Sequence, residues 1–472
     1  MEIIHVSAEC YPVAKVGGLG DVVGALPKYQ QQAGDIAKVV LPAYRTRFIE
    51  THEFEQVHQS GVWVGQQWYH FNVLKEKTNL LGFDLYLVEI PDLFNSAQVY
   101  GAWNDTERFL AFQIAVLDWI NEWVHTPDVI HCHDHHTGLI PFLIQHAFKY
   151  HRIRGVPTVL TIHNAQYQGQ FGWEQFYRLP AFDPAKGGLL GWNNAINPLA
   201  AGIKSAWKVT TVSPGYMQEL YQDANGLQDL LNYEMGKTSG ILNGIDTQVW
   251  DPAKDNMLPA NYKPTTVAKG KQANKLALCE RFDLDPSLPL FSFIGRLVGD
   301  KGADLLPDVI GRALYEQAGK LNFLVLGSGD PHIEWMLEQT RAVNAGNFQL
   351  FIGYDEVLSH HIYAGSDFLL MPSRVEPCGL NQMYALRYGT IPIVRSTGGL
   401  RDTVTDFGDK GGNGVRFLHA SSYDVIHAIG RAIELYADEK KLLKMRKANM
   451  LIDHSWDRSA QQYLDLYKSL KQ

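Results

Sequence analysis

The sequence of 472 residues has few cysteines and no long apolar run. Its four cysteines, Cys10, Cys132, Cys279 and Cys378, are scattered and form no Cys-x-x-Cys pair. This spacing argues against a disulfide framework and against a zinc site built from thiolates. No stretch reaches the roughly 18 consecutive apolar residues that a membrane-spanning helix needs. The composition therefore predicts a protein without a membrane span or structural disulfides.

The chain also lacks a run of Lys or Arg, and its formal net charge is −8. Nucleic acids and anionic membranes attract basic surfaces, so neither is expected as a partner. The N-terminal stretch "MEIIHVSAECYP" has no basic segment followed by a sufficiently long apolar one. It is typical of a first β-strand and not of a signal peptide, and we expect a cytoplasmic protein.

Short apolar runs rich in β-branched residues alternate with helical patterns along most of the chain, which predicts βα units on parallel sheets. The expected strands of the first half are 3–8, 37–44, 84–90, 128–133, 157–163 and 208–213, with a helix over 108–124. Those of the second half are 290–297, 322–329, 348–354, 367–373 and 391–396.

Between the two series, residues 250–275 are polar and carry three prolines, which predicts a linker. We therefore expect two α/β domains of the doubly wound, Rossmann-like type, facing each other across a cleft. The predicted boundaries are 1–245 and 246–454, followed by a final helix from 455 to the end at 472. In open sheets of this kind, ligands bind at the carboxyl ends of the strands, so we expect the ligand site among the residues that follow each strand.

One such stretch is "SRVEPCGLNQ" at 373–382, which joins a predicted strand to a predicted helix. Glu376, Cys378 and Gly379 fall on this turn, where the free N–H groups of a helix start can bind ligand oxygens. Glu376 can accept hydrogen bonds from hydroxyl groups. The alternative is an acidic residue that only complements the helix dipole.

Glycine pairs follow two other predicted strands. Thr397 precedes Gly398 and Gly399 in "STGGLRDTV", and Lys15 lies beside a second pair in "AKVGGLGDVVGALP" (14–27). Such glycines allow backbone N–H groups to approach an anion, although most glycine pairs are only tight turns. The second stretch is neither a GxGxxG fingerprint nor a Walker A loop.

Basic and polar groups follow further strands. Arg296 and Lys301 lie five residues apart in "GRLVGDKGADLL", a spacing that suits a diphosphate but also occurs on ordinary surfaces. His163 and Asn164 end another predicted strand and suit polar hydroxyl groups, although a lone histidine at a strand end is more often a structural residue than a catalyst. Asn243 directly precedes the predicted linker.

The histidine-rich stretch "HCHDHHTG" at 131–138 raises the alternative of a metal site. His131 and His133 point to one face of a strand, and His135 and His136 follow in the loop. No partner cluster with ligand spacing is evident elsewhere in the sequence. We therefore expect no metal and no other cofactor.

The combination of these motifs resembles the bacterial glycogen synthase and plant starch synthase family, which has the glycosyltransferase B-type (GT-B) fold. The resemblance spans the whole chain, and the stretches that carry it are "KVGGLGDVVGALPK", "HCHDHHTGL", "TIHNAQYQGQF", "VTTVSPGYMQE", "GILNGIDTQVWDP", "GRLVGDKGADLL", "GSGDP", "PSRVEPCGLNQMYALRYGTIPIVRSTGGLRDTV" and "SWDRSAQQYL". It implies transfer of glucose from ADP-glucose to the non-reducing end of an α-1,4-glucan such as glycogen, with retention of configuration and without a metal ion.

The resemblance also implies roles for individual residues. Lys15, Arg296 and Lys301 would hold the donor diphosphate, and Glu376 would bind the glucose hydroxyls. His163 and Asn243 would hold the sugar from the N-terminal, acceptor-side domain. The other implied donor-site positions are Gly17, Gly18, Asp21, Asp134, Tyr354 (stacked on adenine), Cys378, Gly379, Leu380, Thr397, Gly398 and Gly399. The catalytic residues would be Glu376, Arg296, Lys301 and His163.

Three alternatives remain open. A related GT-B glucosyltransferase could use a small acceptor or UDP-glucose. A non-catalytic glucan-binding relative would be expected to lose Lys15, Glu376 or the pair Arg296 and Lys301, all of which are present. A metal-dependent hydrolase would use the histidine cluster.

Overall fold

The computed structural model describes residues 1–471. Its contacts divide the chain into two compact units. The N-terminal unit comprises residues 1–243 together with the segment from Trp456 onward, and the C-terminal unit comprises Gly244–Ser455. The chain therefore passes between the units twice, after Asn243 and after Ser455.

The N-terminal unit is built on a nine-stranded sheet of order β11-β10-β7-β6-β1-β2-β5-β4-β3. Its parallel strands are β1 (Glu2–Val6), β2 (Ile36–Pro42), β5 (Asp84–Glu89), β6 (Val129–His133), β7 (Thr158–Ile162), β10 (Lys208–Thr211) and β11 (Thr238–Gly240). The central strands β6 and β7 are buried at every residue, as expected for a parallel sheet covered on both faces.

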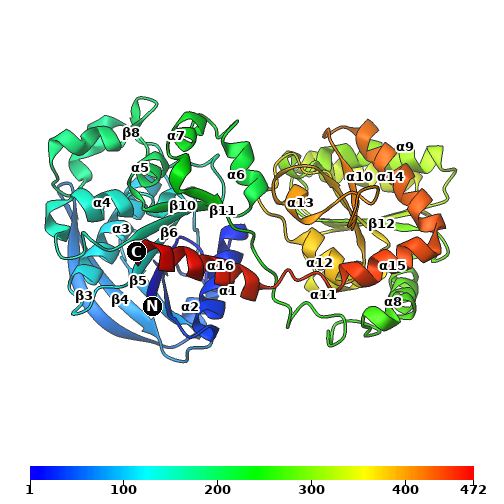
Figure 1. The fold of residues 1–472 in the computed structure, drawn as a ribbon, viewed down its shortest axis with the longest axis horizontal. Helices are drawn as coiled ribbons and strands as arrows, with labels where there is room; N and C mark the ends of the chain where they lie inside the picture. The colour runs from blue at the N-terminus through cyan, green and yellow to red at the C-terminus, as the bar shows by residue number, and fades with distance from the viewer. Residues whose placement is uncertain (472) are drawn as a thin grey trace. The chain divides into compact units, whose positions relative to one another are not determined.

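The helices of this unit are α1 (Gly18–Gln32), α2 (Arg47–Thr51), α3 (Asp105–Asn121), α4 (Ile140–His146), α5 (Pro198–Ser205), α6 (Pro214–Leu220), α7 (Gln228–Tyr233) and α16 (Trp456–Lys468). The last of these, α16, lies beside α1 (Figure 1). Its buried Tyr463 and Tyr467 share an apolar cluster with Val22 and Leu26 of α1 and with Ile3 of β1.

All six strands predicted for this half are present, but a hairpin at the sheet edge was not predicted. Strands β3 (Phe54–Val64) and β4 (Gln67–Glu76) pair antiparallel to each other, and β4 pairs antiparallel to β5. A small second hairpin is formed by β8 (Gly191–Trp192) and β9 (Ala195–Ile196).

The C-terminal unit contains a six-stranded parallel sheet of order β14-β13-β12-β15-β16-β17. The strands are β12 (Leu290–Ile294), β13 (Asn322–Gly327), β14 (Phe348–Ile352), β15 (Phe368–Met371), β16 (Ile391–Arg395) and β17 (Val415–Phe417). The first five confirm the predicted strands, whereas β17 is additional.

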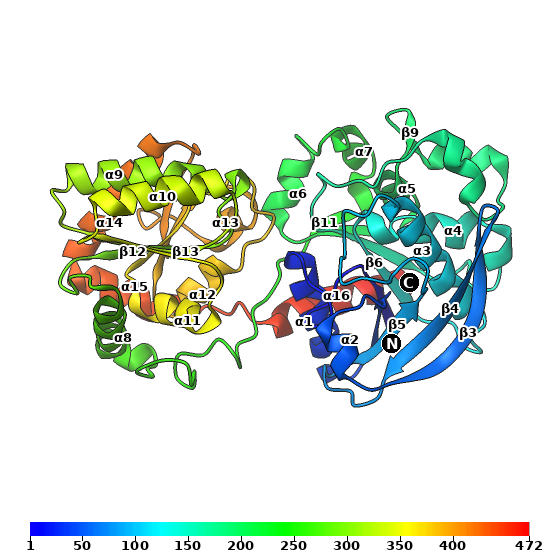
Figure 2. The ribbon, with the colours of Figure 1, turned by 180° about the vertical axis from the view of Figure 1, so that it is seen from behind.

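Helices cover both faces of this sheet. In Figure 2, α9 and α10 lie on one face and α11 and α12 on the other. The helices are α8 (Val267–Phe282), α9 (Leu306–Glu316), α10 (Pro331–Val343), α11 (Glu356–Gly365), α12 (Asn381–Arg387), α13 (Gly398–Thr403), α14 (Ser422–Ala437) and α15 (Glu439–Asn449). The doubly wound α/β architecture predicted for this half is therefore present.

The prediction of a linker over 250–275 is wrong, because this segment packs within the C-terminal unit and enters α8. Tyr262 is buried, and its hydroxyl donates to the carbonyl of Tyr388 at 2.8 Å. Lys271, on α8, is buried and donates to the carbonyl of Ala364 at 2.9 Å and to Thr390 at 2.6 Å. Polar side chains fill positions that an amphipathic pattern would assign to apolar ones.

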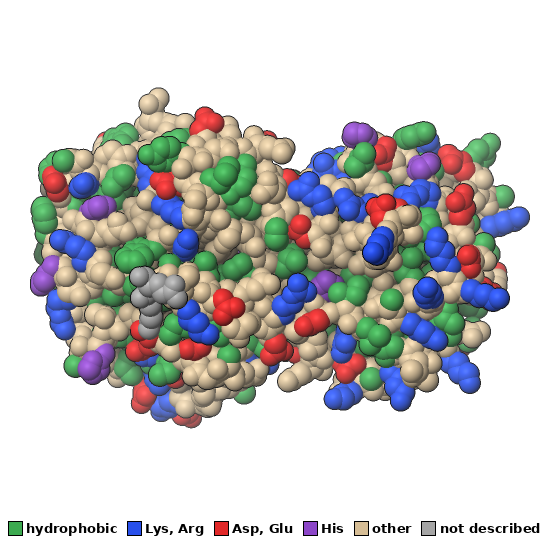
Figure 3. Space-filling model, viewed as in Figure 1, with side chains coloured by type: hydrophobic (Ala, Val, Ile, Leu, Met, Phe, Trp, Pro, Cys, Tyr) green, Lys and Arg blue, Asp and Glu red, His purple; other side chains and the backbone are tan. Residues whose placement is uncertain are grey.

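Among the residues that the structure describes, no helix is both long and apolar enough to cross a membrane. On the face shown in Figure 3, Lys and Arg side chains of the C-terminal unit are interspersed with Asp and Glu.

Candidate active site

In each unit, the predicted site residues follow strands at which the order of the sheet reverses. In the C-terminal unit β12 lies between β13 and β15, and in the N-terminal unit β1 lies between β2 and β6. At such a switch point the connections leave in opposite directions and open a crevice beyond the carboxyl ends of the strands. Arg296, Lys301 and Glu376 follow β12 and β15, whereas Lys15 and Asp134 follow β1 and β6.

Glu376 and Lys301 form a close, partly buried charged pair at the strand ends of the C-terminal unit. The Nζ atom of Lys301 lies 2.7 Å from both carboxylate oxygens of Glu376, and the Ser373 hydroxyl donates to Oε2 at 3.0 Å. The Glu376 side chain is 8% exposed and the Lys301 side chain 26%. The carboxylate is thus held by three hydrogen bonds and is not a mobile surface group.

The turn that carries Glu376 packs directly on the glycine turn after β16. The N–H of Gly399 donates to the Glu376 carbonyl at 3.1 Å. Gly398 has a φ of +43°, and a Cβ atom there would lie 2.0 Å from the same carbonyl oxygen. Only glycine fits this approach, so the pair Gly398 and Gly399 has a structural function next to Glu376.

Two backbone N–H groups on the same turn face no protein acceptor. Among the described residues, the N–H groups of Gly379 and Leu380 have no hydrogen-bond partner, and they immediately precede α12. Gly379 has a φ of +74°. A pair of unpaired N–H groups beside a buried carboxylate is suited to ligand oxygen atoms.

Arg296 and Tyr354 are exposed. Arg296 follows β12 and has no ion pair or hydrogen bond from its side chain among the described residues. Tyr354 follows β14 and is 82% exposed. Both side chains are therefore accessible to a ligand on this unit.

In the N-terminal unit, the loop between β1 and α1 is organised by Glu9, a residue that the sequence reasoning missed. Its buried carboxylate accepts hydrogen bonds from the N–H groups of Val16 (2.5 Å) and Gly17 (2.9 Å) and from the Tyr100 hydroxyl (2.7 Å). Its position directly after the first strand was the available signal. Glu9 therefore fixes the backbone next to Lys15.

Lys15 itself is half-exposed and forms an ion pair with Asp21 at 2.7 Å. A pair this exposed contributes little to stability, about 0–1 kcal/mol, and leaves the ammonium group available. A Cβ atom at Gly17 or Gly18 would meet no atom within 4 Å, so the loop has open space in front of it.

Asp134 is a buried carboxylate in an unusual backbone conformation. It is a non-glycine residue with a φ of +56°, and its Oδ1 accepts from the N–H of His163 at 2.7 Å. Burial, together with the nearby Glu9 charge, raises the pKa of Asp134 to about 7. Strained, titratable residues at strand ends are common in functional sites, so Asp134 fits the predicted site.

His163 and Asn243 are buried polar groups of the same unit. Burial lowers the pKa of His163 to about 3, so its ring is neutral at pH 7. The Oδ1 atom of Asn243 is buried and has no hydrogen-bond partner among the described residues. Leaving such an atom unpaired costs about 1–3 kcal/mol, which a ligand donor would recover.

The histidines considered as metal ligands form a hydrogen-bonded cluster that also includes His5. Potential ligand atoms of His5, His131 and His133 lie within 4.8 Å of one another. However, both ring nitrogens of each residue have a protein partner, among them Gln30, Thr161 and Tyr467 at the outer ends. A metal ion would have to displace several of these bonds, so hydrogen bonding accounts for the cluster.

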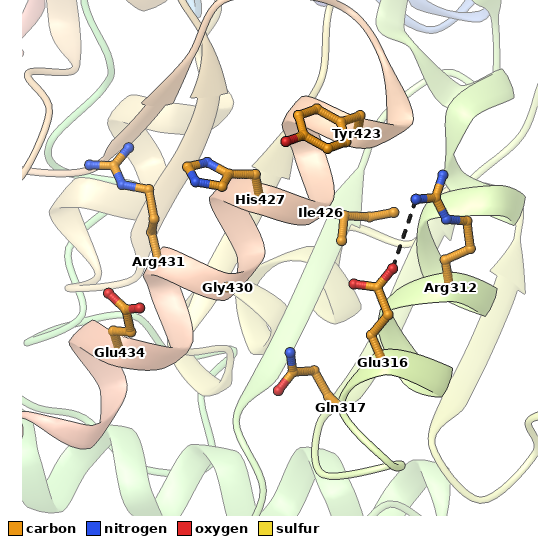
Figure 4. Close-up of a pocket in the computed structure, with 9 residues that line it drawn as sticks. All are labelled: Arg312, Glu316, Gln317, Tyr423, Ile426, His427, Gly430, Arg431 and Glu434. Carbon is orange, nitrogen blue, oxygen red and sulfur yellow. Dashed lines mark ion pairs between the residues drawn. The ribbon is translucent and has the colours of Figure 1, made fainter.

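Each unit also has a hollow on its surface. One, in the N-terminal unit, is polar and is lined by His135, Gln166, Tyr167, Gln168, Gly169, Gln170 and Asn225. The other lies between α9 and α14 and includes the ion pair of Arg312 and Glu316 at 3.8 Å (Figure 4). The second hollow contains no predicted site residue.

Comparison with known proteins decides the family. Residues 2–233 match the family model "Starch synthase catalytic domain", and residues 280–450 match "Glycosyl transferases group 1". The chain is 57% identical over 472 residues to the glycogen synthase of Flavobacterium johnsoniae, covering all of both chains. It is 39% identical to that of Streptococcus sanguinis, again covering all of both. The chain belongs to the glycogen and starch synthase family.

Solved structures agree with this assignment to the synthase family. The catalytic domain of starch synthase IV from Arabidopsis thaliana, bound to ADP and acarbose, has a TM-score of 0.87 at 34% identity and covers 100% of this chain and 99% of its own. Sucrose-phosphate synthase from Thermosynechococcus elongatus has a TM-score of 0.64 at 18% identity, covering 99% and 98%, and supports the fold alone. The predicted GT-B fold and glycosyltransferase class are confirmed, whereas the residue roles remain predictions.

Proposed function

We propose that this synthase-family chain transfers glucose from ADP-glucose to the non-reducing end of an α-1,4-glucan with retention of configuration. The observation that carries the proposal is the full-length, 57% identical match to a glycogen synthase. A related plant enzyme of the same fold is bound to ADP and acarbose, which supports an adenine nucleotide donor. A cytoplasmic location fits an enzyme whose four cysteines are all free and buried.

In this proposal, the C-terminal unit binds the nucleotide diphosphate and the sugar. Arg296 and Lys301 neutralise the diphosphate, and Tyr354 stacks on the adenine ring. Glu376 accepts hydrogen bonds from glucose hydroxyls. The N–H groups of Cys378, Gly379 and Leu380 and the turn of Thr397, Gly398 and Gly399 line the same site.

The N-terminal unit contributes neutral polar groups and one cation. His163, Asn243 and Asp134 bind sugar hydroxyls. Lys15, beside Gly17, Gly18 and Asp21, adds a positive charge for the diphosphate.

The chemistry follows from the charges. The bond between the sugar anomeric carbon and the diphosphate oxygen breaks, and the acceptor hydroxyl oxygen bonds to that carbon from the same face. The departing diphosphate takes the hydroxyl proton. Arg296 and Lys301 stabilise the charge that develops on the leaving group, a contribution of about 3–4 kcal/mol per donor in comparable sites. Glu376 is engaged by Lys301 and Ser373 and so positions the sugar instead of attacking it.

The test is release of ADP from ADP-glucose by the purified protein, with and without glycogen. We expect release that depends on glycogen and a higher kcat/KM with ADP-glucose than with UDP-glucose. Equal or higher kcat/KM with UDP-glucose would contradict the donor assignment. Faster release with a small sugar acceptor than with glycogen would favour the small-acceptor alternative.

A further inference from the structure

A continuous row of hydrogen bonds joins His163 to the interior of the N-terminal unit. The ring nitrogen Nε2 of His163 lies 3.0 Å from Nδ1 of His133, the last residue of β6. On the other side, Nε2 of His133 lies 3.1 Å from Nδ1 of His5 on β1. The row ends at α1, where Nε2 of His5 lies 2.8 Å from Oε1 of Gln30.

The amide of Gln30 gives this row a direction. Its Nε2 donates to the hydroxyl of Tyr467 on α16 at 3.3 Å, so its Oε1 is the atom that accepts from His5. The Tyr467 hydroxyl is itself placed by Nδ1 of His131 at 2.6 Å. Two helices distant in sequence, α1 and α16, therefore hold the amide in one orientation.

The rings are neutral, because burial lowers the pKa of His5 to about 4 and of His163 to about 3, and lowers that of His133 well below its usual value. A neutral imidazole has one N–H donor and one acceptor nitrogen. If His5 donates from Nε2 to Gln30, its Nδ1 must accept from Nε2 of His133. His133 Nδ1 must then accept from Nε2 of His163.

The result is a bare nitrogen at the end of the row. With its proton on Nε2, His163 carries only a lone pair on Nδ1. Among the described residues, that atom has no hydrogen-bond partner, and it is not fully buried, so it retains access to solvent. It is therefore an acceptor available to a hydroxyl donor.

We propose that Gln30, His5 and His133 are positioning residues that hold His163 as the Nε2–H tautomer, so that its Nδ1 accepts a hydrogen bond from a sugar hydroxyl. The row itself is a property of the protein alone, whereas the sugar as its ligand rests on the proposed function. The bare Nδ1 of His163 favours a ligand group that donates a hydrogen bond and disfavours a group that can only accept one.

The direct test is ¹⁵N NMR of the full chain labelled at histidine, in which protonated and unprotonated ring nitrogens resonate in separate ranges. The His163 signals are assigned by their loss in His163→Ala. We expect Nε2 protonated and Nδ1 bare for His5, His133 and His163 in the free protein. A proton on Nδ1 of His163, or an exchanging mixture of tautomers, would overturn the proposal.

The kinetic test compares two replacements of His133. In His133→Asn, the amide Oδ1 replaces ring Nδ1 and still accepts from His163, so we expect kcat within about threefold of wild type. In His133→Leu the acceptor is lost, and we expect kcat to fall about tenfold or more, with the Kd for ADP unchanged. Equal losses of kcat in the two variants would contradict the proposal.

Gln30→Leu gives a second route should His133→Leu fail to fold. It removes the terminal acceptor, and we expect mixed tautomers at His163 with a fall in kcat. The matched control is Tyr150→Phe, which removes a buried hydroxyl of the same unit that donates to Asp118 at 2.8 Å, outside the row and its partners. The control should retain both the His163 tautomer and kcat, and a control that matched Gln30→Leu in its losses would contradict the proposal. If the wild type released no ADP with glycogen, the proposed function would fail, but the NMR result would still decide the tautomer.

Discussion

The strand ends of the two units are chemically different. Those of the C-terminal unit carry formal charges, with Lys301 on Glu376 and an exposed Arg296. Those of the N-terminal unit carry, besides the exposed ion pair of Lys15 and Asp21, buried groups whose pKa values disfavour charge, namely His163 and Asp134. Cations suit a diphosphate, and neutral hydrogen-bonding groups suit hydroxyls. The difference fits the proposed function with a partial division of labour, in which the C-terminal unit supplies most of the leaving-group cations and the N-terminal unit supplies neutral groups that help Glu376 to position the sugar.

The largest effect should come from the charged pair. Lys301→Ala removes a cation and leaves the Glu376 carboxylate buried without its partner, so we expect kcat to fall about 10³-fold. Steady-state kinetics with ADP-glucose and glycogen measure it. Arg312→Ala, an exposed arginine in the same unit away from the strand ends, is the control and should retain activity. A near-normal kcat in Lys301→Ala would contradict the proposal that Lys301 stabilises the leaving group.

We expect acid to destabilise the N-terminal unit more than the C-terminal unit. Below the ordinary histidine pKa of 6.5, the unfolded chain takes up protons that the buried His5, His135 and His163, with pKa values of about 4, 4 and 3, resist. Each such residue lowers the free energy of unfolding by up to about 1.4 kcal/mol per pH unit as the pH falls.

Hydrogen exchange at pH 4 to 7 measures this effect in each unit separately. We expect peptides of the N-terminal sheet to lose protection at a higher pH than those of the C-terminal sheet. The C-terminal unit is the internal control, because its buried His360 faces the Asp255 carboxylate at 2.6 Å. If protection were lost at the same pH in both units, or at a higher pH in the C-terminal unit, the expected difference between the units would be contradicted.

Asp134 should act in the opposite pH direction. Its folded-state pKa of about 7 lies above its ordinary 3.8, so its contribution to stability is full at low pH and is lost as the pH rises through 7. Asp134→Asn can still accept from the His163 N–H and has no such loss. We expect the variant to gain stability relative to wild type between pH 4 and 7, by up to about 1.4 kcal/mol per unit.

Urea unfolding at several pH values measures this gain. Histidine contributions are common to both proteins and cancel in the difference. A constant difference across the pH range would show that the Asp134 carboxyl is not perturbed.

The smallest expected effect is that of chelation. If cations of the C-terminal unit neutralise the diphosphate and the histidines are bound to one another, exhaustive treatment with EDTA should leave kcat unchanged. The control is the same protein after dialysis without chelator. Activity that is abolished and then restored by one divalent ion would reassign the histidine cluster as a metal site.

Most strands and the strand-end residues could be predicted, because buried parallel strands are continuous apolar runs and the polar residues after them stand out. The β3–β4 hairpin was missed although "VWVGQQWYHFNV" alternates in the manner of an edge hairpin. Helix α8 was missed for a physical reason: its buried face includes Lys271, Asn274 and Lys275 instead of an apolar stripe.

Within the candidate site, predictions were limited to residues next to motifs. Glu9 directly follows the first strand and was overlooked, whereas the row from Gln30 to His163 depends on which strands are neighbours in the sheet. Because β1 lies next to β6, His5 and His131 are register partners, and the His5 ring comes within hydrogen-bond reach of His133. Sequence spacing alone does not show that the two strands are neighbours, since His5 and His133 are 128 positions apart.

The most direct test of the division of labour is to measure the Kd for ADP by titration calorimetry, together with kcat, in matched variants of the two units. Arg296→Ala should weaken ADP binding and lower kcat. Asn243→Ala should lower kcat while leaving the Kd for ADP close to that of the wild type, because ADP carries no glucose. The account is contradicted if Asn243→Ala weakens ADP binding as much as Arg296→Ala does, or if Arg296→Ala binds ADP as tightly as the wild type.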